Sequence, residues 1–442
     1  MSATASGFWM FGILMLLLVG RIPIGIAMFI VGAGGYLAFV GDIMPLLNSL
    51  KNLAYARLSN YDLIVIPLFL LMGQFATHGG LSRALFRFVS AFLGHRRGGV
   101  AIASIGACAG FGAICGSSLA TAATMGQVAL PELRRAGYSG ALSTGALAAG
   151  GTLGIMIPPS VPLVIYAILT QESIGKLFMA AVLPGIIAML GYMLVVRIVV
   201  GLDPAAGPAG RRTDWRERLG SLLAVLPVLL VFVVVIVGIY GGWANPTEAA
   251  AIGAAACGLL AVVSGGMRRA GLIESLLGTA QATAMIFLVL LGADMLNTAL
   301  ALSQLPAELA TRVRDSGLSP LLVMASILLI YILLGCVMDS LAMILLTIPI
   351  FYPMVMGLDF WGMSATDKSL WFGILSLTVV EIGLVHPPVG MNVYIINRLA
   401  RDVPLVETFK GVIPFLLSDL VRILLLLFVP GISLFLVHAF AP

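Results

Sequence analysis

Long runs of apolar residues, separated by short polar segments, dominate the chain. Residues 221–240, SLLAVLPVLLVFVVVIVGIY, form one run that is long enough to cross about 30 Å of hydrocarbon as a helix. The runs are continuous and lack the alternation of a transmembrane β-barrel, so they predict α-helices. We predict ten crossings, over residues 7–20, 22–40, 60–78, 138–170, 175–200, 219–241, 247–264, 275–301, 369–398 and 411–438.

Two further apolar stretches, residues 98–131 and 319–354, do not fit a simple crossing. Each is too long for one helix and is interrupted at its centre by small or polar residues, GAICGSSLATAATMG at 112–126 and CVMDSLA at 336–342. Glycine permits a tight reversal of the chain. We therefore predict two re-entrant hairpins, each of which enters and leaves the membrane on the same side.

The distribution of Lys and Arg supports this threading. With the N-terminus outside and both stretches re-entrant, most basic residues fall in cytoplasmic segments, including the pairs at 96–97, 134–135, 211–212 and 268–269. Cytoplasmic loops of membrane proteins carry this excess of positive charge. If either stretch were a single crossing, every later crossing would have the opposite orientation, and the cytoplasmic excess of Lys and Arg would be lost.

The chain also repeats itself across a polar linker, residues 203–218 (DPAAGPAGRRTDWRER). Ser118-Leu-Ala recurs as Ser340-Leu-Ala, and GTLGIMIPPS at 151–160 resembles EIGLVHPPVG at 381–390. Residues 1–202 and 219–442 would each hold five crossings and one hairpin, and because five is odd the second half is inverted. The predicted fold is an all-α polytopic membrane protein built from an inverted repeat, as is typical of secondary transporters.

Composition agrees with this class of protein. The chain is 60% hydrophobic and only 10% charged, whereas soluble domains carry about 25% charged residues. The net charge of +5 resides in short loops without a continuous basic patch, so a nucleic-acid partner is not expected. The cysteines lie in apolar segments without metal-like spacing, which argues against a disulfide framework or a zinc site; they are Cys108, Cys115, Cys257 and Cys336.

Three smaller signals complete the pattern. Residues 43–58 and 80–97 have the character of amphipathic, interfacial helices that could brace a fixed scaffold, or could be ordinary connections. Asn245-Pro246-Thr247-Glu248 is typical of a helix start, with proline in the first turn and an acid near the positive end of the dipole. Arg422 stands inside the last crossing with no assigned role.

The first hairpin tip supplies candidate binding groups. Gly116, Ser117, Ser118 and Thr121 would form this tip, where unwound carbonyls and hydroxyls can coordinate a hard cation. The helix that restarts after the tip would direct its positive end toward an anion. The alternative is a packing face of small residues, for which the same residue types are used.

Each half also contains a predicted helix break. In the first half Thr152 and Gly154 precede Pro158-Pro159, and tandem prolines end a helix. A kink without function is the alternative.

The second half carries acids at the corresponding places. Asp339 lies at the second tip and Glu381 at the start of the second broken crossing, which also contains His386 and Asn392. Either acid could bind a cation, carry a proton or cap a helix, whereas His386 better fits a structural hydrogen bond. Asn392 could offer its amide oxygen.

No Arg or Lys lies at either tip or either break. An anionic substrate there would have its charge met by helix N-termini, hydroxyls and a co-bound cation. Each ligand would then raise the affinity of the other. The sequence therefore predicts cation-coupled symport.

Five segments in order carry a family resemblance: GAICGSSLATAATMG, GTLGIMIPPS, NPTEAAAIGA, MDSLAMILLTIPIFYP and EIGLVHPPVGMNVY. Together they resemble the large membrane subunit of tripartite ATP-independent periplasmic (TRAP) transporters, over about residues 7–438. The resemblance implies a multi-pass protein of the bacterial inner membrane that works as an elevator of the ion-transporter type. It implies import of an organic acid, such as a C4-dicarboxylate or sialic acid, driven by a sodium gradient.

The resemblance also implies partners and site residues. The partners are a separate small four-helix membrane subunit and a periplasmic substrate-binding protein, and sodium is the coupling ion with no other cofactor or metal. No catalytic residue is expected. Carried over by motif position, the contacts for sodium and substrate are Gly116, Ser117, Ser118 and Thr121 at the first tip, Thr152, Gly154 and Pro158 at its break, Asp339 and Ser340 at the second tip, and Glu381, Gly383, Pro387 and Asn392 at its break.

Three alternatives remain at this point. The first is a stand-alone sodium-coupled dicarboxylate symporter of related architecture, although the paired Ser-Asn-Thr motif of those proteins is missing from this sequence. The second is an intramembrane enzyme that uses Asp339, Glu381 or His386, but no second Asp in a matching motif completes a dyad. The third is a channel, which would give flux without a sodium gradient.

Overall fold

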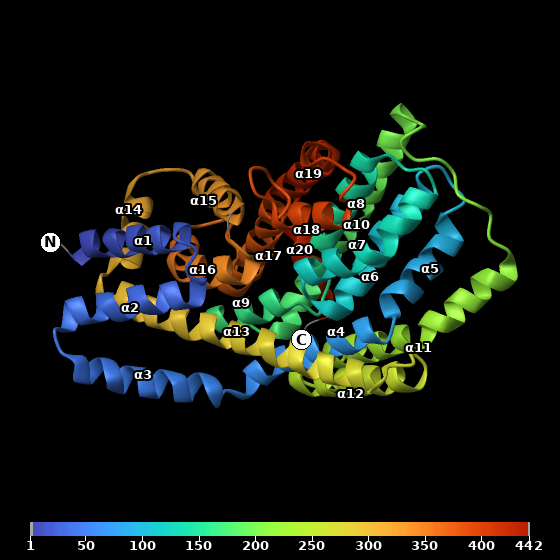
Figure 1. Cartoon of the computed structure of the whole chain (residues 1–442). Coiled ribbons are helices and arrows are strands. Elements are labelled where there is room, and N and C mark those ends of the chain that lie inside the picture. Colours follow the sequence, from blue (N-terminus) through green and yellow to red (C-terminus); the bar gives the residue numbers. More distant parts are fainter. Residues whose placement is uncertain (1–2, 337, 441–442) are drawn as a thin grey trace.

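The computed structural model describes residues 3–336 and 338–440, and within these ranges all regular structure is helical. Figure 1 shows the arrangement of the helices. The first half contains α1 (Ala3–Val19), α2 (Ile24–Val40), α3 (Ile43–Leu58), the short 3₁₀ helix η1 (Tyr61–Ile64), α4 (Val65–His78), α5 (Leu81–Leu93), α6 (Gly99–Cys115), α7 (Ser118–Arg135), α8 (Gly140–Met156), α9 (Val161–Thr170) and α10 (Ile174–Leu202).

An irregular segment then leads to the second half. Its helices are α11 (Trp215–Tyr240), α12 (Pro246–Val263), α13 (Arg269–Leu302), α14 (Leu305–Asp315), α15 (Pro320–Gly335), α16 (Ser340–Met356), α17 (Ala365–Gly383), α18 (Met391–Leu399), α19 (Leu405–Phe428) and α20 (Gly431–Phe440). Residues 99–202 form a pair of helices, then a broken helix, then a long helix. The same order recurs over residues 320–428.

Several helices have the length and composition of membrane spans. Within the described residues, six pass this test on their own, and a seventh passes if α8 and α9 are taken together as one span bent by 41°. Each of the ten stretches expected to cross the membrane coincides with one helix or with two consecutive helices. Together with the apolar composition, this makes the chain a multi-pass membrane protein.

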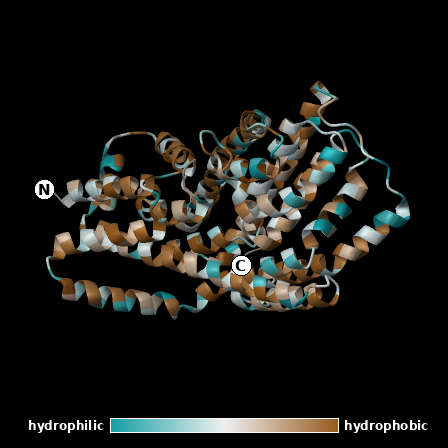
Figure 2. Cartoon of the chain, in the orientation of Figure 1, coloured by the Kyte–Doolittle hydropathy of each residue, from teal (hydrophilic) through white to brown (hydrophobic). Residues whose placement is uncertain are grey.

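The surface of the outer helices is apolar. Leu223, Leu230 and Val234 on α11 are each more than half exposed, as expected for a helix that faces lipid or another membrane subunit. Figure 2 shows that apolar residues predominate along the outer helices, such as α11. By contrast, every residue of α17 from Lys368 to Gly383 is buried, so α17 lies at the centre of the protein.

Local capping signals fix several helix starts. Asn245 caps α12 through a reciprocal capping box with Glu248, and Pro246 occupies the first turn, which confirms the helix start expected there. α3 and α5 form where amphipathic helices were expected. Leu46 is the one residue of α3 that is buried, so packing against the rest of the chain holds α3 only weakly.

The predicted boundaries need three corrections. The stretch 411–438 is two helices, α19 and α20, because Pro430 lacks an amide proton to continue α19. α13 begins at Arg269, earlier than expected. The segment after α13 forms α14, which has proline in its first turn and an ion pair between Glu308 and Arg312 one turn apart.

Two groups of helices are distinguished by their packing. α2 packs along α13, and α4 packs along α12. The pair α6/α7 packs on α8, and the pair α15/α16 packs on α17, while α19 lies against α8. Figure 1 shows α2 beside one end of the long helix α13, which continues toward α4 and α12, and shows α6, α7 and α8 grouped together on the other side of the molecule.

Candidate functional site

The first hairpin tip is a two-residue turn between α6 and α7. Gly116 ends α6 with φ of 63°, a left-handed conformation that glycine adopts without strain. Ser117 is the N-cap of α7, and its hydroxyl accepts a hydrogen bond from the amide of Ala120 at 3.4 Å. A Cβ added at Gly116 would lie 3.1 Å from the carbonyl oxygen of Pro159. The tip therefore reaches the first break.

The first break separates α8 from α9 at the tandem prolines, where the sequence predicted it. α8 ends at Met156, and α9 begins at Val161 after the N-cap Ser160. Pro158 is buried, and the Pro158–Pro159 bond is cis. Thr152 and Gly154 lie in the last turns of α8.

One glycine pair holds each hairpin against its broken helix. A Cβ at Gly112 would lie 2.5 Å from Cα of Gly154, and a Cβ at Gly383 would lie 2.5 Å from Cα of Gly335. Such distances leave no room for any side chain. Gly112 and Gly335 each stand four residues before their tip residue, and Gly154 and Gly383 each stand four residues before a Pro-Pro pair. The two halves thus make the same backbone contact at equivalent sequence positions.

The second tip is closed by an acid. Asp339 is the N-cap of α16 and accepts hydrogen bonds from the amides of Leu341 at 3.2 Å and Ala342 at 3.5 Å. Of the roles that the sequence left open for Asp339, helix capping is the one with visible partners. Ser340, the first residue of α16, is buried.

The second break follows α17. His386 Nδ1 lies 2.5 Å from the carbonyl oxygen of Pro387, and the thiol of Cys336 donates to the same carbonyl at 3.5 Å. His386 therefore makes the structural hydrogen bond expected of it, and the second tip touches the second break. Pro387 itself is exposed, and its bond to Pro388 is cis.

The two halves meet at the first tip. The hydroxyl of Ser118 donates to Oε2 of Glu381 at 2.5 Å, although these residues are 263 positions apart. The amide of Asn392 donates to the carbonyl oxygen of Ala148 on α8 at 3.3 Å. Glu381, Asn392 and Ser118 are all at most 2% exposed. The second break is thus joined to the first hairpin and the first broken helix.

This joint divides the predicted site residues into two groups. One group gathers around Ser118 and Glu381, and it comprises Gly116, Ser117, Ser118, Thr121, Thr152, Gly154, Glu381 and Asn392. Pro158 is buried at the first break, next to Pro159, whose carbonyl oxygen approaches Gly116. The other gathers around the second tip, and it comprises Asp339, Ser340, Gly383 and Pro387.

The first group contains oxygens without partners. Thr121 Oγ1, Glu381 Oε1 and Asn392 Oδ1 are buried and have no hydrogen-bond partner within the described part of the chain. Buried polar atoms are normally satisfied, so these three oxygens are available to a ligand. Oxygen is the ligand that hard cations prefer. No group of three or more His, Cys, Asp or Glu side chains among the described residues could hold a metal ion, so a transition-metal site is not indicated there.

Three residues beside this group had no role in the sequence analysis, although Arg422 was noted there inside an apolar crossing. The hydroxyl of Tyr192 lies 3.1 Å from Oγ1 of Thr152 and 2.9 Å from both carboxylate oxygens of Asp419. Arg422, one turn further along α19, places Nη2 2.8 Å from Oδ1 of Asp419. An Asp and an Arg three residues apart inside an apolar run were the available signal.

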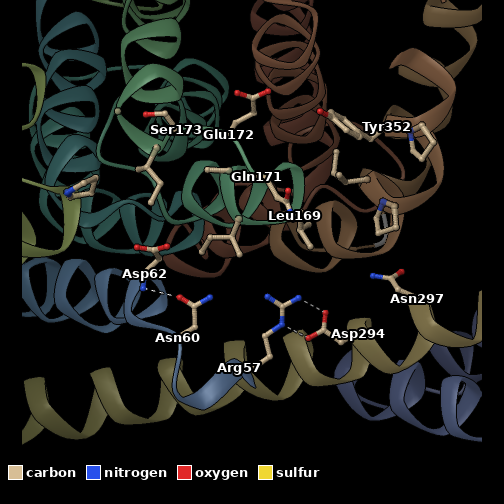
Figure 3. A pocket seen from close by; sticks show the side chains of 18 of the residues that line it. Arg57, Asn60, Asp62, Leu169, Gln171, Glu172, Ser173, Asp294, Asn297 and Tyr352 are labelled. Carbon is tan, nitrogen blue, oxygen red and sulfur yellow. Dashed lines mark hydrogen bonds and ion pairs between the residues drawn. The ribbon is translucent and has the colours of Figure 1, made fainter. Parts of the chain in front are cut away.

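A separate cavity of about 930 Å³ lies between α3, α13 and the ends of α9 and α16. Figure 3 shows Arg57 of α3 paired with Asp294 of α13 on its wall, where Nη2 of Arg57 lies 2.6 Å from Oδ1 of Asp294. Asp62 and Glu172 also line the cavity, so its wall carries three carboxyl groups, counting Asp294, and one guanidinium group. None of the predicted site residues lines this cavity.

Comparisons with known proteins agree with the resemblance. A family model described as "Tripartite ATP-independent periplasmic transporter, DctM component" matches residues 11–432. A C4-dicarboxylate TRAP transporter large permease protein of Pseudomonas aeruginosa is 37% identical over 88% of this chain and 89% of its own. A sialic acid TRAP transporter large permease protein of Vibrio cholerae is 31% identical over 87% of this chain and 88% of its own.

One solved structure has a similar fold. The YdaH transporter of Alcanivorax borkumensis superposes with a TM-score of 0.57 at 15% sequence identity and covers 89% of each chain. At this identity the likeness concerns the fold alone. It places the helices of this chain in an architecture that is known from a membrane transporter.

Proposed function

This chain belongs to the DctM family of TRAP transporter large permease subunits, and from this premise we propose that it imports an organic acid by sodium-coupled symport. It would do so in the bacterial inner membrane, together with a small membrane subunit and a periplasmic binding protein. The proposed substrate is a C4-dicarboxylate or a similar carboxylate, because the relative at 37% identity is named for C4-dicarboxylates.

The observation that carries this proposal is the hydrogen bond between Ser118 and Glu381. It joins the tip of the first hairpin to the second break in a buried position and leaves Oε1 of Glu381 free. A cation bound to that free oxygen, to Thr121 Oγ1 and to Asn392 Oδ1 would bridge the two halves of the chain.

Coupling would follow from this geometry. Without a cation, the buried carboxylate of Glu381 repels an approaching organic anion. With a monovalent cation bound, the charge is neutralised and the N-terminus of α7, capped by Ser117, can face the carboxylate of the substrate. Because binding of each ligand raises the affinity of the other, neither would cross alone.

Movement would use the two groups of helices. The hairpins α6/α7 and α15/α16 and the broken helices they contact would move as one body, since the glycine pairs leave no slack between them. The helices α2, α4, α12 and α13 would form the scaffold. The exposed apolar face of α11 offers a surface for lipid or for the small subunit.

The test is uptake of a radiolabelled C4-dicarboxylate into proteoliposomes that contain this chain, its small subunit and its binding protein. We expect uptake that needs an inward sodium gradient and stops when potassium replaces sodium. Equal uptake without any gradient would indicate a channel and overturn symport. Uptake without the binding protein would favour a stand-alone symporter.

A further inference from the structure

A chain of hydrogen bonds runs from the first break into the last long helix. It passes from Thr152 on α8 through Tyr192 on α10 to Asp419 and Arg422 on α19. Tyr192 is fully buried, Asp419 is 1% exposed and Arg422 is 3% exposed. The labels in Figure 1 place α8, α10 and α19 beside one another, and α19 packs on both of the others.

Asp419 fixes the direction of this chain. An ionised carboxylate only accepts hydrogen bonds, so the single proton of the Tyr192 hydroxyl is donated to Asp419. The Tyr192 oxygen can then only accept from Thr152, whose hydroxyl lies 2.6 Å from its other neighbour, the carbonyl oxygen of Ala149. The single proton of Thr152 is directed toward these two acceptors, so the lone pairs of the Thr152 oxygen point away from them.

The charges in this region do not balance. Glu381, Asp419 and Arg422 are all buried, and Glu381 lies within electrostatic range of both others. Arg422 is paired with Asp419, and with both carboxylates ionised the three groups together carry one negative charge in excess. Lys368 does not offset it, since it lies thirteen residues before Glu381 on α17, about 20 Å along the helix axis, and donates to carbonyl oxygens of Met356 and Leu358.

The guanidinium group of Arg422 has donors without hydrogen-bond acceptors among the described residues. Its Nη2 is close to Asp419, yet Nε, Nη1 and Nη2 lack an acceptor in hydrogen-bonding geometry within the described part of the chain. A buried guanidinium in this state acts mainly through its charge. Its effect is to offset Asp419 while leaving the charge of Glu381 to another cation.

We propose that Tyr192, Asp419 and Arg422 are positioning residues of the cation site at Glu381: they orient the Thr152 hydroxyl and hold the buried charge at one negative unit, which one monovalent cation neutralises. This inference rests on the proposed sodium-coupled function. None of the three residues needs to touch the cation.

The decisive variant is Tyr192→Phe, because it removes one hydroxyl and alters no charge. We expect the sodium concentration for half-maximal uptake to rise about tenfold, while the maximal rate at saturating sodium stays within twofold of the wild type. The matched control is Tyr331→Phe. Tyr331 is fully buried and its hydroxyl also bonds a threonine hydroxyl, that of Thr347 at 2.7 Å, but it lies outside this network.

Variants of the two charged residues Asp419 and Arg422 test the second half of the proposal. Asp419→Asn removes the excess negative charge, so it should weaken sodium binding more than Tyr192→Phe does. Arg422→Lys keeps the charge and should stay within a few-fold of the wild type, whereas Arg422→Gln leaves a buried carboxylate unpaired and can unfold the protein. Sodium-dependent thermal stabilisation of the purified chain, measured against choline, gives sodium affinity without transport.

The outcomes separate the two proposals. If the wild type shows no sodium dependence in either assay, sodium coupling itself is wrong. If the wild type depends on sodium but Tyr192→Phe and Asp419→Asn leave half-saturation and thermal stabilisation unchanged, the positioning network is wrong and sodium coupling stands. The inference would also be overturned if Tyr331→Phe raised the sodium concentration for half-maximal uptake as much as Tyr192→Phe does.

Discussion

At the scale of single residues, the hydroxyl of Ser118 is the one partner that the described residues give to the carboxylate of Glu381. In Ser118→Ala both carboxylate oxygens are left buried without a hydrogen bond, which costs about 1–3 kcal/mol for such a group. We expect sodium-driven uptake to fall at least tenfold while membrane insertion is unaffected. Uptake assays and the amount of protein in purified membranes measure the two effects, and wild-type uptake would refute the role given to this contact.

Asp339 allows capping to be separated from ion binding. Asp339→Ala removes the cap of α16, costs about 1 kcal/mol and should reduce uptake, whereas Asp339→Ser keeps a capping oxygen without the charge and should restore most of it. Initial rates of uptake for the two variants decide the matter. If both lose uptake equally, the carboxylate charge is required and Asp339 binds an ion or a proton.

Residue roles were predictable only where the signal is local. The Asn245 cap and the structural bond of His386 follow from neighbours in the sequence. The bond from Ser118 to Glu381, and the network of Tyr192, Asp419 and Arg422, join segments that are hundreds of residues apart. A single sequence contains no signal for pairs so far apart, and the spacing of Asp419 and Arg422 is the one local sign of the network.

At the scale of elements, each hairpin is held to its broken helix by a contact between two glycines. In Gly154→Ala the new methyl group would meet Oγ1 of Thr121 at 2.6 Å and the carbonyl oxygen of Ser117 at 2.7 Å. Overpacking of this kind costs about 1–3 kcal/mol. We expect a lower melting temperature and loss of uptake, measured on purified and reconstituted protein.

The matched control is Gly220→Ala, also within a helix, where a Cβ would meet nothing within 4 Å. We expect Gly220→Ala to be neutral or slightly stabilising, since alanine has the higher helix propensity. Gly383→Ala should behave like Gly154→Ala, because it occupies the equivalent position. Indistinguishable melting temperatures for Gly154→Ala and Gly220→Ala would contradict the close approach seen in the structure.

Most elements could be predicted because their signals are strong. Glycine and tandem proline interrupt apolar runs at 116 and 158–159, and helices end there. The end of α19 before Pro430 was missed because a single proline within a long apolar run can also be tolerated, as Pro184 and Pro227 are inside α10 and α11. Which outcome occurs depends on packing rather than on local sequence.

At the scale of the whole molecule, the fold class followed from hydropathy, but the relation of the helices to the bilayer did not. Within the described residues, length and composition identify six or seven spans, whereas the apolar helices α1 and α2, of 17 residues each, are shorter than those spans. The inverted repeat is a claim about which side of the membrane each loop occupies. The paired glycine contacts support a duplication, and only a measurement of sidedness tests the inversion.

Single cysteines at the ends of the hairpins make that measurement. The native cysteines are all buried, so they should not react with an impermeant maleimide. Arg97 and Arg135 are exposed at the ends of the first hairpin, and Asp315 and Asp359 are exposed at the ends of the second. Arg96 and Arg134 remain beside the first two substitutions and preserve the local positive charge.

We expect Arg97→Cys and Arg135→Cys to react only from the cytoplasmic side, and Asp315→Cys and Asp359→Cys only from the periplasmic side. Labelling of intact cells before and after permeabilisation distinguishes the two. Ends of one hairpin on different sides would make that stretch a crossing and reverse the orientation of every helix after it. Four ends on the same side would leave the hairpins intact but exclude inversion, because two tips entering from one face cannot form the alternately accessible site that symport requires.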